Sequence, residues 1–167
     1  MHDPRFEPGL AAIYALDPTP ARHTQANQME IPPGLDWELP PRGQLKGRGR
    51  LASRLSALTH VVNSSGMCLF ALGCMTVQDF AGFLAATTGL ERGIPELEVI
   101  GMEIANLRHE FNEREGVDLS REPFPARALG IPPAEGGPWS GVSLDLEDMT
   151  TEFLEAMGWK KDGGIQP

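Results

Sequence analysis

The fold of this chain is decided by residues 51–68, which read LASRLSALTHVVNSSGMC. Apolar side chains recur at helical spacing through Leu51, Leu55, Leu58 and Val62, and this pattern predicts an amphipathic helix. A helix that is apolar on one side needs a partner to pack against, so we expect it to lie at the edge of a core. The polar side of the expected helix carries Arg54, Ser56 and His60.

A polar turn follows this helix, and it holds a glycine and then a thiol, Gly66 and Cys68. The apolar run 69–75 comes directly after it. Such a turn makes a poor core, but it can bring backbone N–H groups and a sulfur close to a bulky buried cofactor. One cysteine cannot hold an iron–sulfur cluster, which normally takes four protein ligands. If Cys68 is a cluster ligand, most of the site lies outside these 167 residues.

Composition restricts the class of protein. Apolar residues make up 41% of the chain, enough for the core of one domain or of the end of a larger protein. The net charge of -9 argues against nucleic-acid and anionic-membrane partners. The sequence lacks both a long apolar run, which would span a membrane, and an apolar leader at its start. The two cysteines lie six positions apart, which gives neither a disulfide framework nor the spacing of a zinc site. A reducing compartment is therefore favoured, and we expect a cytoplasmic protein.

Local signals place a short helix before the decisive stretch and another after it. Residues 9–16 predict the short helix inside an otherwise Pro/Gly-rich arm. Thr76 followed by Asp79 resembles a capping box with Asp in the usual Glu position. This helix should run to about Thr87 and close at Gly89.

Two more helices are expected towards the C-terminus. Pro95 suits a first helical turn, and Gly116 should end the helix that it opens. A last helix should stop at Gly158, with Trp159 beyond it, in a Schellman-like motif. The apolar stripe of the first of these helices is Leu97, Ile100, Ile104, Leu107 and Phe111. The stripe of the last one is Leu146, Met149, Phe153 and Met157.

These elements predict an all-α fold with long Pro/Gly-rich loops, because hairpin signals and repeats are missing from the sequence. The loops cover most of residues 1–45 and then 123–141. Loops longer than about 15 residues in a compact domain usually indicate function or a missing partner. We therefore divide the chain into an arm, 1–45, and a helical domain, 46–167.

Five short stretches form an ordered series along nearly the whole chain. They read HDPR at 2–5, YALDPTPARHT at 14–24, VNSSGMC at 62–68, NLRHEFNEREG at 106–116, and in the tail LD at 144–145 with MGW at 157–159 and Gly164. In order and spacing, the series resembles the C-terminal part of the tungsten-containing aldehyde ferredoxin oxidoreductase family. The arm then resembles the end of the family's second domain, and the rest its helical C-terminal domain.

The resemblance implies an oxidoreductase that works only when completed by other segments. Enzymes of this family carry tungsten, sometimes molybdenum, between two pyranopterins, with a [4Fe–4S] cluster beside them. They oxidise an aldehyde to a carboxylic acid and pass the electrons to ferredoxin. This chain is similar to about the last quarter of such an enzyme. The implied partners are therefore an N-terminal polypeptide or domain carrying the CxxCxxxC cluster motif, ferredoxin and a small aldehyde.

The resemblance also assigns cofactor-binding residues in the decisive stretch. Cys68 stands at the end of the family's DxxGLC motif, where the fourth cluster ligand lies, and Gly66 matches its glycine. Asn63 stands where the family has an Asp that binds the pterin ring. An Asp accepts hydrogen bonds with full charge, whereas Asn offers one carbonyl acceptor and adds a donor. Met67 replaces a leucine and would contribute its backbone amide.

One histidine is the catalytic candidate. By its placement, His23 resembles the family's active-site histidine, a proton donor or hydrogen-bond partner near the metal. Imidazole suits this task because its pKa lies near neutral pH. A lone histidine in a loop is more often structural, and both interpretations stay open. The neighbouring Arg22 is expected to face solvent.

Three further features remain, and two of them, Cys68 and the basic cluster, have more than one interpretation. Cys68 could also be a small buried hydrophobe, and Cys74, which matches no family ligand, is expected in the core. The basic cluster of Lys46, Arg48 and Arg50 could contact pterin phosphates or an acidic ferredoxin, or could be a solvated loop.

The sequence thus favours the C-terminal part of a tungsten or molybdenum pterin, iron–sulfur aldehyde ferredoxin oxidoreductase. A split enzyme with a separately encoded N-terminal polypeptide is one form of this hypothesis. The alternative is a non-catalytic remnant or structural subunit that has lost its cofactor. Asn63 in place of Asp favours the remnant, whereas Cys68, His23 and Gly66 favour the enzyme.

Overall fold

The computed structural model describes residues 2–41, 43–117, 124–160 and 165, and these residues form an all-α fold. The α-helices are α1 (Gly9–Leu16), α2 (Arg48–Ser64), α3 (Val77–Thr88), α4 (Ile94–Arg114) and α5 (Glu147–Met157). Short 3-10 helices are η1 (Asn27–Met29), η2 (Leu69–Gly73) and η3 (Ala126–Leu129). Within the described ranges, β-structure is limited to isolated bridges, so the predicted fold class is confirmed.

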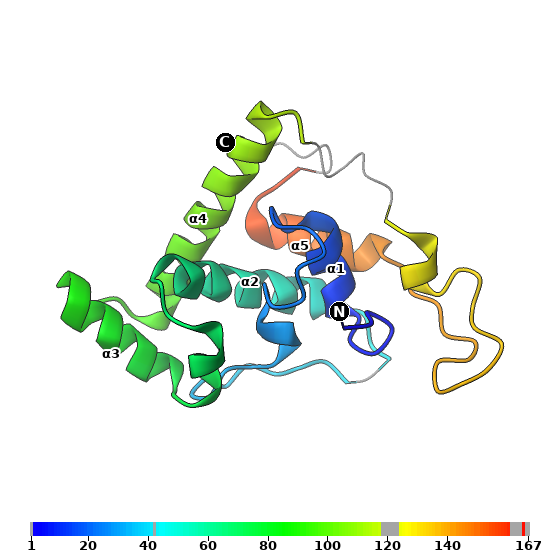
Figure 1. Ribbon diagram of the computed structural model, residues 1–167, viewed down its shortest axis with the longest axis horizontal. Helices are drawn as coiled ribbons and strands as arrows, with labels where there is room; N and C mark the ends of the chain where they lie inside the picture. The colour runs from blue at the N-terminus through cyan, green and yellow to red at the C-terminus, as the bar shows by residue number, and fades with distance from the viewer. Residues whose placement is uncertain (1, 42, 118–123, 161–164, 166–167) are drawn as a thin grey trace.

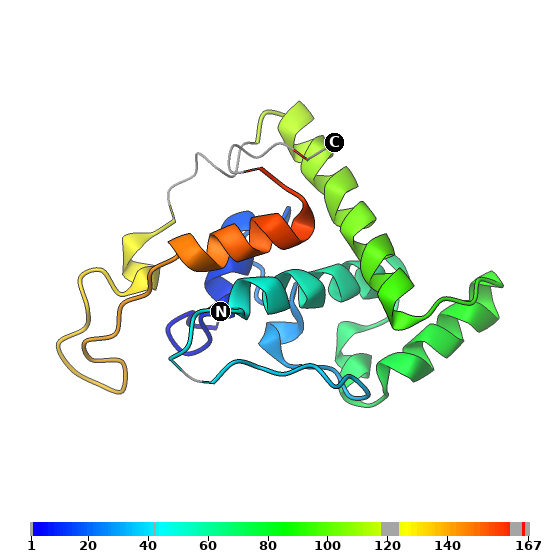
Figure 2. The ribbon, with the colours of Figure 1, turned by 180° about the vertical axis from the view of Figure 1, so that it is seen from behind.

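Helix α2 is the central element, and it contacts α1, α4, α5, η1 and η2. Figure 1 shows α1 and α5 against its first half and α4 crossing its second half, and Figure 2 shows the same arrangement from behind. Because neighbours surround it, α2 is buried on its polar side as well: Ser56 and His60 are both 0% exposed. The polar side that the sequence pattern gives to this helix is therefore buried at Ser56 and His60.

Two clusters of apolar side chains make the core, one on each half of α2. The first joins α1 and α5 to the start of α2, and Leu10, Leu55 and Phe153 are among its buried members. The second joins α3, α4 and η2 to the end of α2. Since residues of the arm and of the rest of the chain share the first cluster, α1 is an integral part of this core. The domain boundary near residue 45 stays a prediction.

The predicted ends of α3 and α5 are confirmed in detail. Thr76 accepts a hydrogen bond from the Asp79 amide, and the Asp79 carboxylate accepts one from the Thr76 amide, which completes the capping box. After α5, Gly158 takes the left-handed conformation at φ 69°, and the Trp159 amide donates to the Leu154 carbonyl. The arm's short helix, 9–16, also forms as predicted.

The apolar stripe predicted for α4 is only partly right. Leu97 is buried, but Leu107 is 68% exposed and Phe111 is 53% exposed. The face that packs on α2 instead follows Leu97, Gly101, Ala105 and His109. Small side chains let two helices approach closely, and a Cβ added to Gly101 would lie 2.0 Å from the Ala57 carbonyl oxygen of α2. Close backbone contact, rather than side-chain size, therefore selects the packed face of α4.

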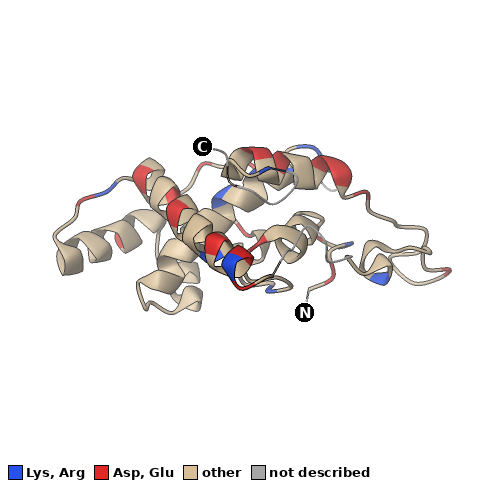
Figure 3. Ribbon diagram, turned by 90° about the horizontal axis from the view of Figure 1, so that it is seen from above, with Lys and Arg blue, Asp and Glu red and all other residues tan. Residues whose placement is uncertain are grey.

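Charge is distributed unevenly over the surface. In the ribbon of Figure 3, many of the Asp and Glu positions, coloured red, lie along α4 and α5. None of the helices in the described part of the chain combines the length and the apolar character needed to cross a membrane. The part of the long loop that precedes residue 124 lies outside the described residues.

We predict that Gly101→Ala lowers the free energy of unfolding by about 1–3 kcal/mol, because the new methyl group meets backbone that side-chain rotation cannot move. Gly82→Ala on α3 is the matched control, since open space surrounds its Cβ position. Alanine is the better helix former, so the control should be neutral or more stable by up to about 1 kcal/mol. Urea denaturation of both variants checks this, and equal effects would contradict it.

Candidate cofactor-facing site

The polar turn after α2 presents the Cys68 thiol to solvent. Gly66 has φ 76°, a left-handed conformation that glycine adopts at little cost, and the space around its Cβ position is open. The Ser65 hydroxyl donates to the Val62 carbonyl at 2.7 Å and accepts from the Met67 amide at 3.2 Å. The backbone amide of Met67 is thus engaged within the turn itself, which fixes the path of the chain into Cys68.

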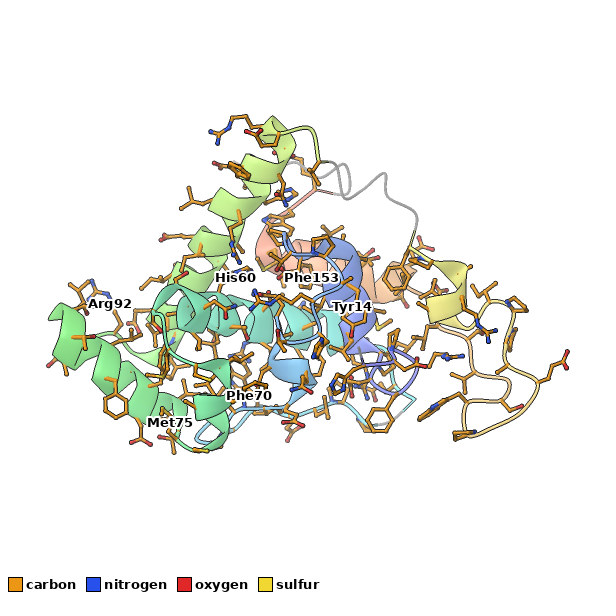
Figure 4. The ribbon with its side chains drawn as sticks, viewed as in Figure 1. Tyr14, His60, Phe70, Met75, Arg92 and Phe153 are labelled. Carbon is orange, nitrogen blue, oxygen red and sulfur yellow. The ribbon has the colours of Figure 1, made fainter. Side chains whose placement is uncertain are left out.

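Both cysteines are exposed, so neither is a buried core residue. For Cys74 the core prediction is wrong, because η2 turns only Leu72 fully inward and leaves Cys74 and Phe70 at the surface. Figure 4 shows Phe70 and Met75 at the η2 end of the molecule, away from Tyr14 and Phe153. Cys68 likewise does not act as a small buried hydrophobe in the described structure.

A buried carboxylate lies behind the turn, at the end of α1. Asp17 is 0% exposed and accepts hydrogen bonds from the Thr19 hydroxyl at 2.7 Å and the Ser56 hydroxyl at 2.6 Å. The His60 Nε2 atom lies 3.3 Å from Asp17 Oδ2. Burial alone would raise the pKa of Asp17, but His60 and the two hydroxyls outweigh it and hold the pKa below its ordinary value. The carboxylate is therefore ionised inside the core.

His60 connects this carboxylate to α4. An Arg108 guanidinium nitrogen lies 3.2 Å from His60 Nδ1, and a guanidinium can only donate. Nδ1 must therefore accept, so a neutral His60 carries its proton on Nε2, the atom that faces Asp17. Figure 4 places His60 in the interior, between α1 and α4. Sequence reasoning missed this contact, because one Asp and one His that are 43 positions apart carry no local signal.

The same network reaches the candidate cofactor residue Asn63. The Asn63 Nδ2 atom lies 3.3 Å from Gln25 Oε1, and the Thr19 oxygen lies 3.5 Å from that same Gln25 atom. Gln25 is 0% exposed. The loop after α1 is consequently held against α2 at both of its ends, by Asp17 on Ser56 and by Gln25 on Asn63.

His23 lies on this loop, two residues before Gln25. Its ring is half-buried and stacks on the ring of His2, with the centroids 4.9 Å apart. Partial burial and the nearby charges of His2 and Arg22 hold the pKa of His23 below its ordinary value. Arg22 itself faces solvent, as expected. The structure thus places the loop that carries His23 beside the end of α2, where Asn63 stands.

Backbone strain marks the same loop and the 3-10 helix η1 that follows it. Ala21, Asn27, Gln28 and Met29 all have positive φ, a conformation that side chains other than glycine rarely adopt. Such strain costs about 1–3 kcal/mol per residue and persists only where the surroundings fix it, as they commonly do at functional sites. The sequence offers no signal for it, because none of these residues is a glycine.

The basic cluster does not form a common anion-binding surface. Arg48 is 1% exposed, pairs with Glu7, and donates to the carbonyls of Gln44, Pro40 and Pro41. The interpretation of Arg48 as an anion contact is therefore wrong, because its donors are already used to fix the arm. Lys46 and Arg50 are exposed.

A cavity adjoins Arg48, at the opposite end of α2 from Cys68. Its volume is about 730 Å³, and His2, Glu7 and Glu30 are among its lining residues. A helix of 17 residues is about 25 Å long, so this cavity is separate from the thiol turn. Among the residues that the structure describes, no three His, Cys, Asp or Glu side chains gather into a possible metal site.

The structure is a helical segment with an exposed cysteine in the turn after α2, and comparison with known proteins identifies its family. The family model described as "Aldehyde ferredoxin oxidoreductase, domains 2 & 3" matches residues 1–167, so the chain belongs to this family. The tungsten-containing aldehyde ferredoxin oxidoreductase of Pyrococcus furiosus is 28% identical over 167 residues, and that of Thermococcus kodakarensis is 27% identical over 167. Each alignment covers 98% of this chain but only 27% of the relative.

We predict that Asp17→Asn lowers the free energy of unfolding at pH 7 by about 3–5 kcal/mol, since it removes the charge that the buried network surrounds. The folded pKa of Asp17 is depressed, so its stabilisation is complete above the unfolded pKa, near 3.8, and is lost as the pH falls through the folded pKa. The difference from wild type should therefore shrink below about pH 4.

Urea denaturation at pH 7, 5 and 3 measures this, with the exposed Asp36→Asn as a control of equal charge change that should stay within about 0.5 kcal/mol of wild type. A penalty for Asp17→Asn that is as large at pH 3 as at pH 7 would show that the carboxylate charge is not what stabilises the core.

Proposed function

We propose that this chain is the C-terminal part of an aldehyde ferredoxin oxidoreductase and supplies one cysteine ligand to a [4Fe–4S] cluster and one wall of a pterin pocket. The observation that carries the proposal is the exposed Cys68 thiol at the end of a turn fixed by Ser65. Membership of the family supports it. Because the chain spans 27% of the relatives' length, the rest of such a site would come from other segments.

The turn after α2 is better suited to supply a cluster ligand, through Cys68, than to make the family's contacts with the pterin, through Asn63 and Met67. A thiolate is the ordinary protein ligand of iron–sulfur clusters, and Cys68 is accessible from outside the described residues. The open space around Gly66 leaves room for a bulky group beside the backbone. Two contacts fit less well, since Met67 uses its amide within the turn and Asn63 lacks the charge of Asp.

When bound, the tungsten–pterin and cluster would supply two-electron oxidation of an aldehyde to a carboxylic acid and delivery of electrons to ferredoxin. Within this chain, His23 would handle a proton. Its lowered pKa keeps the imidazole neutral at pH 7, so it can accept a proton as a general base. Its stacking on His2 fixes the plane in which the ring can do so.

A polypeptide that carries the CxxCxxxC motif is the proposed partner. Support comes from large apolar side chains left exposed on and near α3, α4 and η2, because single soluble domains rarely leave such residues uncovered in groups. They include Phe70, Phe83, Leu90, Val99, Leu107 and Phe111. We further propose a cytoplasmic setting, in which a free thiol and an iron–sulfur cluster are stable.

A second candidate function is a structural subunit without cofactor. Asn63 favours it, because the family's charged pterin contact is missing here. The two proposals differ in metal content, so analysis of the assembly purified from its native host distinguishes them. Iron together with tungsten or molybdenum, in a complex with a second polypeptide, would support the enzyme. A metal-free assembly would support the structural subunit.

We predict that Cys68→Ser lowers the iron content of the purified assembly, because a hydroxyl is a poor replacement for a thiolate ligand. Most copies of the assembly should lose at least the iron of one cluster. Cys74→Ser is the matched control: it alters the other exposed cysteine and should leave the iron content unchanged. Metal analysis by mass spectrometry and the visible absorbance of the cluster measure the effect. Equal iron in both variants would exclude Cys68 as a ligand.

We predict that His23→Gln lowers kcat/KM for aldehyde oxidation by about 10²–10⁴-fold, because it removes the proton acceptor. The wild-type kcat/KM should fall on the acid side with a midpoint below the ordinary histidine value of 6.5, and the variant should lose that limb. Arg22→Gln changes the exposed neighbour and should retain the limb. A variant that keeps both the rate and the limb would remove His23 from catalysis.

A further inference from the structure

The number of hydrogen-bond donors in the buried network around Asp17 determines the orientation of two side-chain carboxamides, those of Gln25 and Asn63. The Asp17 carboxylate is ionised and can only accept, so the single hydroxyl proton of Thr19 is used in the 2.7 Å bond to Asp17. The Thr19 oxygen can then only accept from its other neighbour, Gln25, which lies 3.5 Å away. A donor is therefore required on the Gln25 atom nearest to Thr19.

The opposite end of the Gln25 side chain poses the matching problem. With Oε1 facing Thr19, the Gln25 Nε2 group is buried and has no hydrogen-bond partner among the described residues. A buried amide with two unused N–H groups is costly, whereas a carbonyl left without a partner is better tolerated. A half-turn of the Gln25 carboxamide moves Nε2 between two neighbours, Thr19 and Asn63, and leaves every carbon in place.

We infer that Gln25 is a positioning residue for the proposed pterin contact: its Nε2 donates to the Thr19 hydroxyl oxygen and to Asn63 Oδ1, so Asn63 turns its N–H₂ group outward. Both carboxamides rotate together, because the Asn63 atom that faces a donor must be its carbonyl oxygen. Every donor in the network then points away from Gln25, on one side to Asn63 and on the other side to Thr19, whose own hydroxyl donates to the charge of Asp17. Asn63 thereby has a single fixed orientation.

The outward group has a consequence for the ligand, and this step rests on the proposed function. In the family the corresponding Asp accepts hydrogen bonds from the N–H groups of the pterin. Here residue 63 would instead offer a donor, which suits a carbonyl oxygen or an unprotonated ring nitrogen on the heterocycle. Residue 63 of this chain would therefore favour a heterocycle whose facing edge carries a hydrogen-bond acceptor. An Asp at position 63 would take the same donor from Gln25 and point its second oxygen outward.

Neutron diffraction from crystals of the assembly grown in D₂O tests the orientation directly, with no variant required. We expect deuterium on the Gln25 atom that lies between Thr19 and Asn63, and deuterium on the Asn63 atom that points away from Gln25. Deuterium on the Asn63 atom that faces Gln25 would overturn the inference. This result does not depend on whether a cofactor is bound, so its failure and the failure of the proposed function are distinguishable.

Pterin retention tests the consequence. If residue 63 now offers a donor, Asn63→Asp should raise the amount of pterin retained by the assembly by about tenfold, as expected for regaining a charged hydrogen bond. Gln44→Glu adds the same charge at an exposed position of the arm, before α2, and should change nothing. Oxidised pterin is measured by its fluorescence. Unchanged retention in Asn63→Asp, in an assembly that holds pterin, would overturn the assignment of an outward donor.

Discussion

The structure depends on one buried charge, the carboxylate of Asp17. An ionised group in a protein core is tolerated only when hydrogen bonds and an opposite partner replace the water that it loses. Asp17 receives the hydroxyls of Thr19 and Ser56 and faces His60, and His60 in turn contacts Arg108. These residues come from the end of α1, from α2 and from α4. The carboxylate therefore fixes the relative positions of three helices that apolar contacts alone would leave free to slide.

The candidate site inherits its rigidity from this charge. The loop after α1 begins at Asp17 and carries His23 and Gln25, and Gln25 contacts Asn63 at the end of α2. Ala21 in this loop and the three residues of η1 that follow it are held at positive φ, which a segment without such anchors would relax. The catalytic candidate and the pterin candidate, although 40 positions apart in sequence, are thus placed by the same set of buried hydrogen bonds.

Local chemistry made parts of this fold predictable. A capping box at Thr76 and a glycine stop at Gly158 depend on a few neighbouring residues, and both formed where the sequence placed them. The faces of α2 and α4 depend on partners that are distant in sequence, and there the pattern did not show which side is buried. His60 was assigned to the polar side of its helix while its buried partner Asp17 was unknown, and Leu107 to the core because the close approach at Gly101 was unknown. Periodicity identifies a helix more reliably than it identifies the side that the helix buries.

The candidate site was located by resemblance to the family. Whether its residue 63 presents a hydrogen-bond donor or an acceptor is inferred from the structure alone. The turn of Gly66 and Cys68 was identifiable from the sequence, and its role at a cofactor stays a prediction; the structure shows that Cys68 is exposed. Whether Asn63 can replace an Asp cannot be decided from residue type, since a carboxamide has a donor end and an acceptor end. The decision comes from Thr19, whose single proton is committed to Asp17. The charge that holds the helices together would therefore also determine, through Thr19 and Gln25, which hydrogen-bonding group Asn63 presents to the proposed cofactor.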